Sequence, residues 1–452
     1  MIKHNKLKSF LPYQVMMIGK ILRFGRRQHH TIISREIIKP SSPTTSHLQT
    51  YNLSYLDQGI PHIYIPLILF YPNNENCSLT ADYKAQKLKK SLSQTLTRYY
   101  PFAGRLHTPT TPYVDCNDEG VVFVEAKHDS QLHKFQHTIE EEDETIRQLF
   151  ADDMVWQKSP HSTSLVGVQV NHFACGGIGL AVSMSHKICD GCTLGSYMNY
   201  WASVARCGST DHKEVLPLNP HFIQFPTTTN PINPLQPTTK IRCAHFVTRK
   251  FIFPNSKLSD LKNKISSIHN PTRFELLSSL IYKTVVAATT RRSSSFTPYF
   301  LAIPIDVRNH FVPKLPQTTV GNFLRTMLVA TRHESETSLS VLVSEIRKEK
   351  MEVKRVQSSQ LTSQSLESVM SRIGVSRSFW CSSLCGFPYS KVDFGLGNPT
   401  VASVTFGALR RNGCVLMDTP NGDGILARVT LESPDMEVFR NDKEMLSFCK
   451  IN

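Results

Sequence analysis

The order of hydrophobic and polar residues along the chain predicts strands and helices that alternate through two halves. An apolar run at 63–71 has the length of a buried strand. Leucines then recur every four residues from Leu88 to Leu96, a helical spacing that ends before Pro101. By the same criteria we expect strands at 121–125, 165–173, 178–184, 299–305, 401–406, 414–417 and 425–431, and helices after Gly191 and at 261–265, 275–286 and 339–346. Such alternation is typical of an α/β protein.

A proline-rich stretch separates the two halves. Six prolines lie within 217–237, among many threonine and asparagine residues. Proline fixes one backbone dihedral and interrupts both helices and sheet ladders. We therefore expect residues 217–240 to form a crossing between two α/β units.

Charge is concentrated at the start of the chain. The 452 residues carry a formal net charge of +15, and eight basic residues precede the first acid, Glu36, which leaves +7 on the other 417 residues. That excess is mild, and no helix-turn-helix, zinc-finger or ribonucleoprotein motif accompanies it, so we expect no nucleic-acid partner. The acid-free leader, residues 1–32, fits either a disordered extension or a transit peptide. Met16 or Met17 also offers a later start.

Composition predicts a soluble protein of a reducing compartment. Hydrophobic residues make up 40% of the chain and charged residues 19%, which is an ordinary globular balance. No apolar run approaches the ~18 residues of a membrane span. Eleven cysteines in a chain of this length do not suggest a disulfide scaffold. We expect a cytoplasmic protein without a membrane partner, and organelle targeting by the leader stays open.

His186 and Asp190 form the most informative candidate site. The strand expected at 178–184 delivers His186, and Asp190 follows four residues later with Gly191 behind it. An imidazole at a strand end with a carboxylate nearby suits a general base. A histidine in such a position can equally be a satisfied core residue, so this pattern alone does not decide between the two.

Metal or redox chemistry is a second interpretation of the same segment. Cys189 and Cys192 form a C-x-x-C that overlaps the motif. A zinc site needs at least three protein ligands, and Cys381 and Cys385 are the only other close cysteine pair. We therefore expect no metal. The sequence also lacks the G-x-S-x-G, Walker and G-x-G-x-x-G motifs of other catalytic classes.

Two phrases together favour the general-base interpretation. They are His-x-x-x-Asp-Gly at 186–191 and Asp-Phe-Gly-Leu-Gly-Asn-Pro at 393–399. With them the chain resembles the plant BAHD acyl-CoA-dependent acyltransferases, and within that family the vinorine synthase-like branch. The resemblance runs from 33 to 448 and includes shorter phrases at 38–44, 53–58 (Leu-Ser-Tyr-Leu-Asp-Gln), 99–106 (Tyr-Tyr-Pro-Phe-Ala-Gly-Arg-Leu), 115–118, 271–273, 320–322 (Val-Gly-Asn) and 417–418.

The resemblance implies a fold and its division. It implies two chloramphenicol-acetyltransferase-like domains of mixed β-sheet flanked by helices, joined by a crossover loop, with a channel between them. The first domain would span 33–216, with 393–418 packing onto it. The linker would span 217–240 and the second domain 241–452.

The resemblance also implies an activity. His186 would lie midway along the channel and take the proton from an acceptor hydroxyl as its oxygen attacks the CoA thioester. The expected partners are a hydroxylated small molecule and an acyl-CoA, with acetyl-CoA foremost, as co-substrate rather than as bound cofactor, in a monomeric protein. N-acylation of an amine and a catalytically impaired relative are the alternatives.

Asp190 would serve this site mainly as an anchor. The family resemblance implies that its carboxylate turns away from the channel and pairs with Arg308 in the second half. Gly191 is expected to support the same loop. Removing one partner of a buried ion pair is strongly destabilising, by ~3–5 kcal/mol, so Asp190 would be essential without transferring a proton.

The second phrase contains a departure from the family. Asp393, which we also count among the catalytic residues, belongs to a signature that holds the channel wall and the CoA side in place. Gly395 and Gly397 suit a tight turn that a β-carbon would obstruct. The usual tryptophans are replaced by Leu396 within the phrase and by Leu384 before it. Two missing indoles remove packing area, so either the local packing is rebuilt or the CoA side is altered and activity is reduced.

Overall fold

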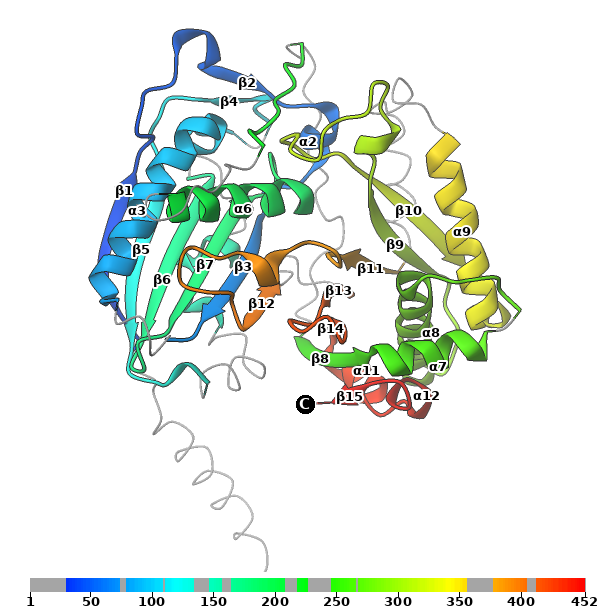
Figure 1. Ribbon diagram of the computed structural model, residues 1–452. Helices are drawn as coiled ribbons and strands as arrows, with labels where there is room; N and C mark the ends of the chain where they lie inside the picture. The colour runs from blue at the N-terminus through cyan, green and yellow to red at the C-terminus, as the bar shows by residue number, and fades with distance from the viewer. Residues whose placement is uncertain are drawn as a thin grey trace, which may run out of the picture.

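Two mixed β-sheets, each flanked by helices, form the framework of the computed structural model (Figure 1). The expected α/β class with two sheet-containing units is confirmed. The structure describes residues 30–73, 79–108, 110–133, 146–156, 164–207, 218–226, 245–265, 267–355, 377–404 and 412–451. The leader before residue 30 and the linker residues 227–240 lie outside these ranges. Among the helices of the described residues, none has the length and apolar character needed to cross a membrane.

The first sheet has six strands in the order β1-β5-β6-β7-β3-β12. Its strands are β1 (His30–Ile38), β3 (Tyr64–Tyr71), β5 (Val121–His128), β6 (Val166–Phe173), β7 (Ile178–Ser185) and β12 (Val401–Val404). Only β5 and β6 run parallel among these neighbouring pairs. Every residue of β6 and β7 is buried, which accounts for the mostly apolar sequences that predict them.

Helices α3 (Ala81–Arg98) and α6 (Gly191–Cys207) cover one face of this sheet and pack on each other (Figure 1). The indole N–H of Trp201 on α6 donates to Oγ of Ser91 on α3 at 3.0 Å. Apolar side chains of both helices and of the central strands form one buried cluster. Only residues 186–190 separate β7 from α6, so the sheet and the helix fix both ends of that loop.

The second sheet has seven strands in the order β10-β9-β11-β13-β14-β8-β15. Its strands are β8 (Phe246–Pro254), β9 (Tyr299–Asp306), β10 (Leu324–Thr331), β11 (Arg377–Ser383), β13 (Gly413–Asp418), β14 (Gly424–Glu432) and β15 (Lys450–Ile451). Helices that pack on one face of it are α7 (Asn255–Lys264), α8 (Arg273–Ser293), α9 (Leu339–Arg355), α11 (Ser433–Phe439) and α12 (Lys443–Leu446). The other face turns toward the first unit, because Val415 and Met417 belong to the buried cluster that holds α6.

Shorter elements lie among these strands and helices. β2 (Thr50–Asn52) and β4 (Tyr113–Asp115) form a separate two-stranded sheet, and α2 (Tyr55–Gly59) follows β2. Ser54 and Asp57 form a reciprocal capping box at the start of α2. Short 3-10 turns span Ser46–Leu48, Tyr100–Ala103, Ala151–Trp156, Arg308–His310, Glu334–Thr337 and Tyr389–Lys391.

The segment that we expect to return to the first unit is divided between the two sheets. β12 pairs with β3 in the first sheet, in agreement with the expectation for 393–418. β13, from the same segment, lies between β11 and β14 in the second sheet, and its Val415 and Met417 side chains pack in the buried cluster of the first unit. The strands with which β13 pairs determine the sheet to which it belongs. Strand propensity is a local property and does not predict such long-range pairing.

Two further differences from the prediction concern strands that the sequence analysis does not identify. The expected leader overlaps the fold, because residues 30–32 are part of β1. The sequence analysis also misses β8, β10 and β11. β8 contains the polar run Thr248, Arg249 and Lys250, and seven of its nine residues are only partly buried. A strand with this exposure shows no clean apolar pattern.

Candidate active site

His186 lies in the loop between β7 and α6, at one end of the first sheet. Its backbone N–H donates to the carbonyl of Ile63 at 2.8 Å, next to the strand pair that Ser185 forms with Tyr64. Its side chain is half-buried. The predicted strand therefore delivers the histidine, and backbone pairing fixes the point from which the ring projects.

A contact from the second unit orients the imidazole. Nδ1 of His186 lies 2.9 Å from Oδ1 of Asn322. The Asn322 amide is itself fixed, because its Nδ2 donates to the carbonyl of His186 at 2.6 Å and to Oδ1 of Asp57 at 2.9 Å. A carbonyl oxygen only accepts, so the amide atom that faces Nδ1 is the oxygen. Nδ1 therefore carries the proton, and Nε2 is the basic nitrogen of the ring.

Asp57 lies buried behind this amide. Its Oδ1 accepts the backbone N–H of Asn322 at 2.7 Å as well as the side-chain amide. Its Oδ2 accepts the backbone N–H and the hydroxyl of Ser54 at 3.0 and 2.6 Å. Burial raises the pKa of Asp57, and the hydrogen bonds from Ser54 and Asn322 oppose that rise. All of these partners donate, an arrangement that suits a carboxylate.

Lys187 is buried beside the same short helix. Its Nζ donates to the carbonyl of Gln58 at 2.8 Å, and its side chain is almost fully enclosed. Burial lowers the pKa of Lys187 to about 8, although the charge of Asp57 acts in the opposite direction. The α2 side of the site therefore contains a buried carboxyl and a buried amine.

Asp190 forms the buried ion pair with Arg308 that the family resemblance implies. Its two oxygens lie 2.7 and 3.0 Å from the guanidinium nitrogens, and neither side chain is exposed. The carboxylate also accepts the backbone N–H groups of Thr193 at 2.8 Å and Phe323 at 3.1 Å. Asp190 thus caps α6 and ties the loop that carries His186 to the second unit.

The C-x-x-C pair has the surroundings of neutral thiols. Sγ of Cys189 donates to the carbonyl of Asp190, and Sγ of Cys192 donates to the carbonyl of Gln317. Burial raises the pKa of both thiols, that of Cys192 to about 11. Metal binding and thiol redox chemistry use the thiolate, which these surroundings disfavour. Across the described part of the chain, no group of three or more His, Cys, Asp or Glu side chains is placed to hold a metal.

Asp393 is the acceptor of a tight turn. Its Oδ1 accepts the backbone N–H groups of Gly395, Leu396 and Gly397 at 2.7, 2.9 and 2.9 Å. The two glycines have φ of +79° and +84°, a left-handed conformation that glycine adopts without a steric penalty. Arg206 at the end of α6 donates to the Asp393 carbonyl. The turn predicted from the sequence is present.

The structure does not bring Asp393 together with His186. Next to Asp393, Phe394 packs on Tyr71 with ring centroids 6.2 Å apart. Tyr71 is the last residue of β3, whereas His186 lies beside the first residues of that strand. β3 has eight residues, and a strand rises ~3.4 Å per residue, so more than ~20 Å separates its two ends. Asp393 therefore lies at the opposite end of β3 from His186.

Leucines fill the positions where the family usually has tryptophan. Leu384 and Leu396 are both partly buried and pack against the core of the first unit. A β-carbon at Gly191 would lie 2.9 Å from Cδ2 of Leu384, so the glycine at the start of α6 leaves room for this leucine. The two leucines thus contact the core at the positions of the usual tryptophans.

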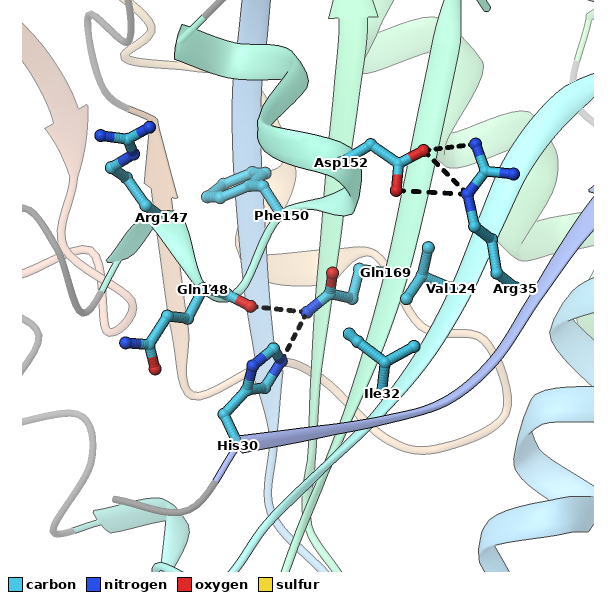
Figure 2. A pocket seen from close by; sticks show the side chains of 9 residues that line it. All are labelled: His30, Ile32, Arg35, Val124, Arg147, Gln148, Phe150, Asp152 and Gln169. Atoms are coloured by element: carbon cyan, nitrogen blue, oxygen red, sulfur yellow. Dashed lines mark hydrogen bonds and ion pairs between the residues drawn. The ribbon is translucent and has the colours of Figure 1, made fainter. Parts of the chain in front are cut away.

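A cavity of about 350 Å³ lies elsewhere, on the first sheet (Figure 2). Its lining includes Val124, whose neighbour Phe123 points into the core beneath α3 and α6. Successive residues of a strand face opposite sides, so the cavity opens on the face away from those helices. An Arg35–Asp152 ion pair of 2.6 Å lies at its wall (Figure 2). This cavity is therefore not part of the His186 site.

Asp57 and Asn322 are the site residues to which sequence analysis assigns no role. Both fall in phrases shared with the family, at 53–58 and 320–322. The spacing of Ser54 and Asp57 signals a capping box, but it does not reveal a partner 265 residues away in the chain. Only the folded arrangement of the two units brings Asn322 to His186.

Comparison with known proteins agrees with this geometry. A sequence model of the transferase family matches residues 28–446. Akuammiline synthase 1 of Alstonia scholaris is 35% identical over 433 residues, covering 93% of this chain and 97% of that protein. Deacetylvindoline O-acetyltransferase of Catharanthus roseus is 33% identical over 439 residues, covering 92% and 97%. The crystal structure of vinorine synthase matches with a TM-score of 0.78 at 28% identity, covering 94% of this chain and 99% of that one. The chain belongs to this transferase family, the BAHD acyltransferases, and is an acyltransferase.

Proposed function

We propose that the protein transfers an acyl group from acyl-CoA to a hydroxyl group of a plant specialised metabolite, with His186 as the general base. Family membership supplies the reaction class and acyl-CoA as the co-substrate. One observation carries the assignment of the base. The Asn322 amide oxygen accepts from Nδ1 of His186, which leaves Nε2 as the nitrogen that takes a proton.

In this mechanism Nε2 takes the proton of the acceptor hydroxyl while the hydroxyl oxygen attacks the thioester carbonyl carbon. The C–S bond then breaks, the acyl group stays on the acceptor oxygen, and the imidazolium returns its proton to the CoA thiolate. A positioned base of this kind is worth ~10²–10⁴-fold in rate. No acyl-enzyme is needed, because a site that holds both substrates makes the reaction effectively unimolecular.

Acetyl is the acyl group that we propose first, with an alkaloid, terpenoid or sugar ester as acceptor. The Catharanthus roseus relative is named as an O-acetyltransferase, and that name supports the choice. We further propose a monomer that works in the cytoplasm in a channel between the two units. The nine cysteines of the described residues are all free, as suits a reducing compartment.

The His186→Ala variant tests the proposed function. Purified protein is incubated with acetyl-CoA and a panel of alcohols and amines, and release of the CoA thiol is followed. We expect kcat to fall by ~10²–10⁴-fold, the usual contribution of a general base. His47→Ala serves as the matched control, because His47 is an exposed histidine in a short turn, and we expect it to keep wild-type activity.

Each outcome of this assay decides one part of the proposal. Turnover by His186→Ala at the wild-type rate would show that His186 is not the base. Turnover of amines in place of alcohols would make the protein an N-acyltransferase. A wild-type protein that acylates no acceptor in the panel and does not bind CoA would be an impaired relative.

A further inference from the structure

We infer that Asp57 is a positioning residue for His186, acting through Asn322 to hold the imidazole in its basic tautomer. The inference rests on the proposed function of His186. Asp57 comes from α2 in the first unit, Asn322 from the loop before β10 in the second, and His186 from the loop after β7. The three side chains form one continuous chain of hydrogen bonds.

Asp57 holds Asn322 at two points. Its Oδ1 accepts both the backbone N–H of Asn322 at 2.7 Å and the side-chain Nδ2 at 2.9 Å. The first bond fixes where the residue lies, and the second fixes which way its amide faces. Asp57 and Asn322 are both buried, at 1% and 0% exposure, so water does not readily replace either bond.

The orientation of the amide decides the state of the imidazole. With the observed orientation, the amide oxygen accepts from Nδ1–H of His186. A flipped amide would present N–H to Nδ1 and its oxygen to the carbonyl of His186, which now accepts from Nδ2 at 2.6 Å. Nδ1 would then have to accept, the proton would move to Nε2, and the ring could no longer take a proton there.

The second carboxylate oxygen of Asp57, Oδ2, is bonded within the capping box of α2. Ser54 donates to Oδ2 with its backbone N–H and its hydroxyl, and its Oγ accepts from the Asp57 N–H at 3.0 Å. The capping box of α2 thus uses Oδ2 and leaves Oδ1 for the two bonds to Asn322. Ser54 contacts Asp57 on the oxygen away from the site, which makes it a matched control.

The test is a double-mutant cycle on the full chain, made of Asp57→Ala, Asn322→Ala and the double variant. We expect Asp57→Ala to lower kcat by about 10- to 100-fold, the range for partners that orient a metal-binding histidine. The KM for acetyl-CoA should change little. The double variant should be no slower than Asn322→Ala alone, because residues that act through one another are not additive.

Two further variants separate positioning from folding. Ser54→Ala removes the α2 cap but leaves both bonds to Asn322, so it should lower the unfolding temperature without lowering kcat. Asp57→Asn keeps an oxygen that can accept from Asn322, so its kcat should lie between those of the wild type and Asp57→Ala. It also serves if Asp57→Ala does not fold.

A spectroscopic readout completes the test independently of turnover. The ring nitrogen shifts of 15N-histidine-labelled protein report the tautomer of His186, whose signals disappear in His186→Ala. We expect the Nδ1–H tautomer in the wild type and in Ser54→Ala, and loss of that preference in Asp57→Ala. A wild type without turnover would refute the proposed function, and the tautomer would still decide the role of Asp57. Wild-type kcat and tautomer in Asp57→Ala, or an effect that multiplies with that of Asn322→Ala, would overturn the inference.

Discussion

Asp190 shows how a carboxylate four residues from a proposed general base can serve as an anchor of the fold. Its carboxylate accepts from Arg308 and from the N–H groups of Thr193 and Phe323. Neither it nor Arg308 is exposed. A carboxylate with these bonds and no solvent contact is an anchor, and the four-residue spacing from His186 lets it cap α6 while His186 lies half-buried at the other end of the loop.

Replacing Asp190 with alanine should destabilise the protein by ~3–5 kcal/mol, because Arg308 would keep a buried charge without its partner. Denaturant unfolding at pH 7 measures this loss. Asp260→Ala is the control, since Asp260 forms an exposed ion pair with Lys257 and exposed pairs contribute ~0–1 kcal/mol. An Asp190→Ala protein of wild-type stability that lacks activity would point instead to a direct role in the reaction.

Some residues of the candidate site can be predicted from the sequence and others cannot, for a physical reason. His186 and its strand follow from a local apolar pattern, and the Asp190–Arg308 pair follows from the family resemblance. Asp57 and Asn322 carry no local sign of their contact with His186, because that contact depends on how the two units pack. A hydrogen bond between residues 136 positions apart has no periodicity that a sequence pattern can display.

At the scale of elements, the 393–399 turn is a support built around one carboxylate oxygen. Asp393 satisfies consecutive backbone N–H groups of the turn, and Phe394 packs between Tyr71 and Trp201. The turn connects the 3-10 turn Tyr389–Lys391 with β12, which lies at the edge of the first sheet. The turn lies at the end of β3 that is remote from His186, and its contacts stabilise the edge of the first sheet.

Asp393→Ala should lower the free energy of unfolding by ~1–3 kcal/mol, because it leaves backbone donors of the turn without their acceptor. Asp393→Asn is the matched variant: its amide oxygen can accept the same N–H groups, so it should stay closer to the wild type. Urea unfolding gives both values, and kcat is measured at a temperature where each variant is folded. Folded Asp393→Ala should retain turnover, whereas a loss of kcat at unchanged stability would show that Asp393 is a catalytic residue.

Strands and helices can be predicted from the sequence where their burial requires a regular pattern of apolar residues. The buried strands β3, β6 and β7 and the amphipathic helices α3, α6 and α9 stand out for that reason. β8 and β11 are partly buried along most of their length, so their sequences mix polar and apolar residues on both faces. The pairing of β12 with β3 joins residues more than 300 positions apart, and a local sequence pattern cannot predict such a pairing.

At the scale of the whole molecule, the two units are tied together at several separate points. β12 extends the first sheet after the chain has passed through the second unit. The Asp190–Arg308 pair and the Asp57–Asn322 bonds cross the same boundary. Val415 and Met417 of the second sheet share a buried cluster with the first unit. Because of these contacts, unfolding of one unit should destabilise the other.

We therefore expect both units to unfold in one transition, although chains with two domains often do not. Phe394→Ala removes a buried ring from the core of the first unit and should cost ~3–5 kcal/mol, and Leu280→Ala, in the core of the second, ~2–5 kcal/mol. Both side chains are fully buried. Calorimetry should show a single transition that each variant moves to lower temperature, and the protection of backbone amides against hydrogen exchange should fall together in β7 and in β14. Two transitions, each shifted by only one of the variants, would mean that the ties between the units are too weak to couple their unfolding, and that the alignment of Asn322 with His186 varies as the units move.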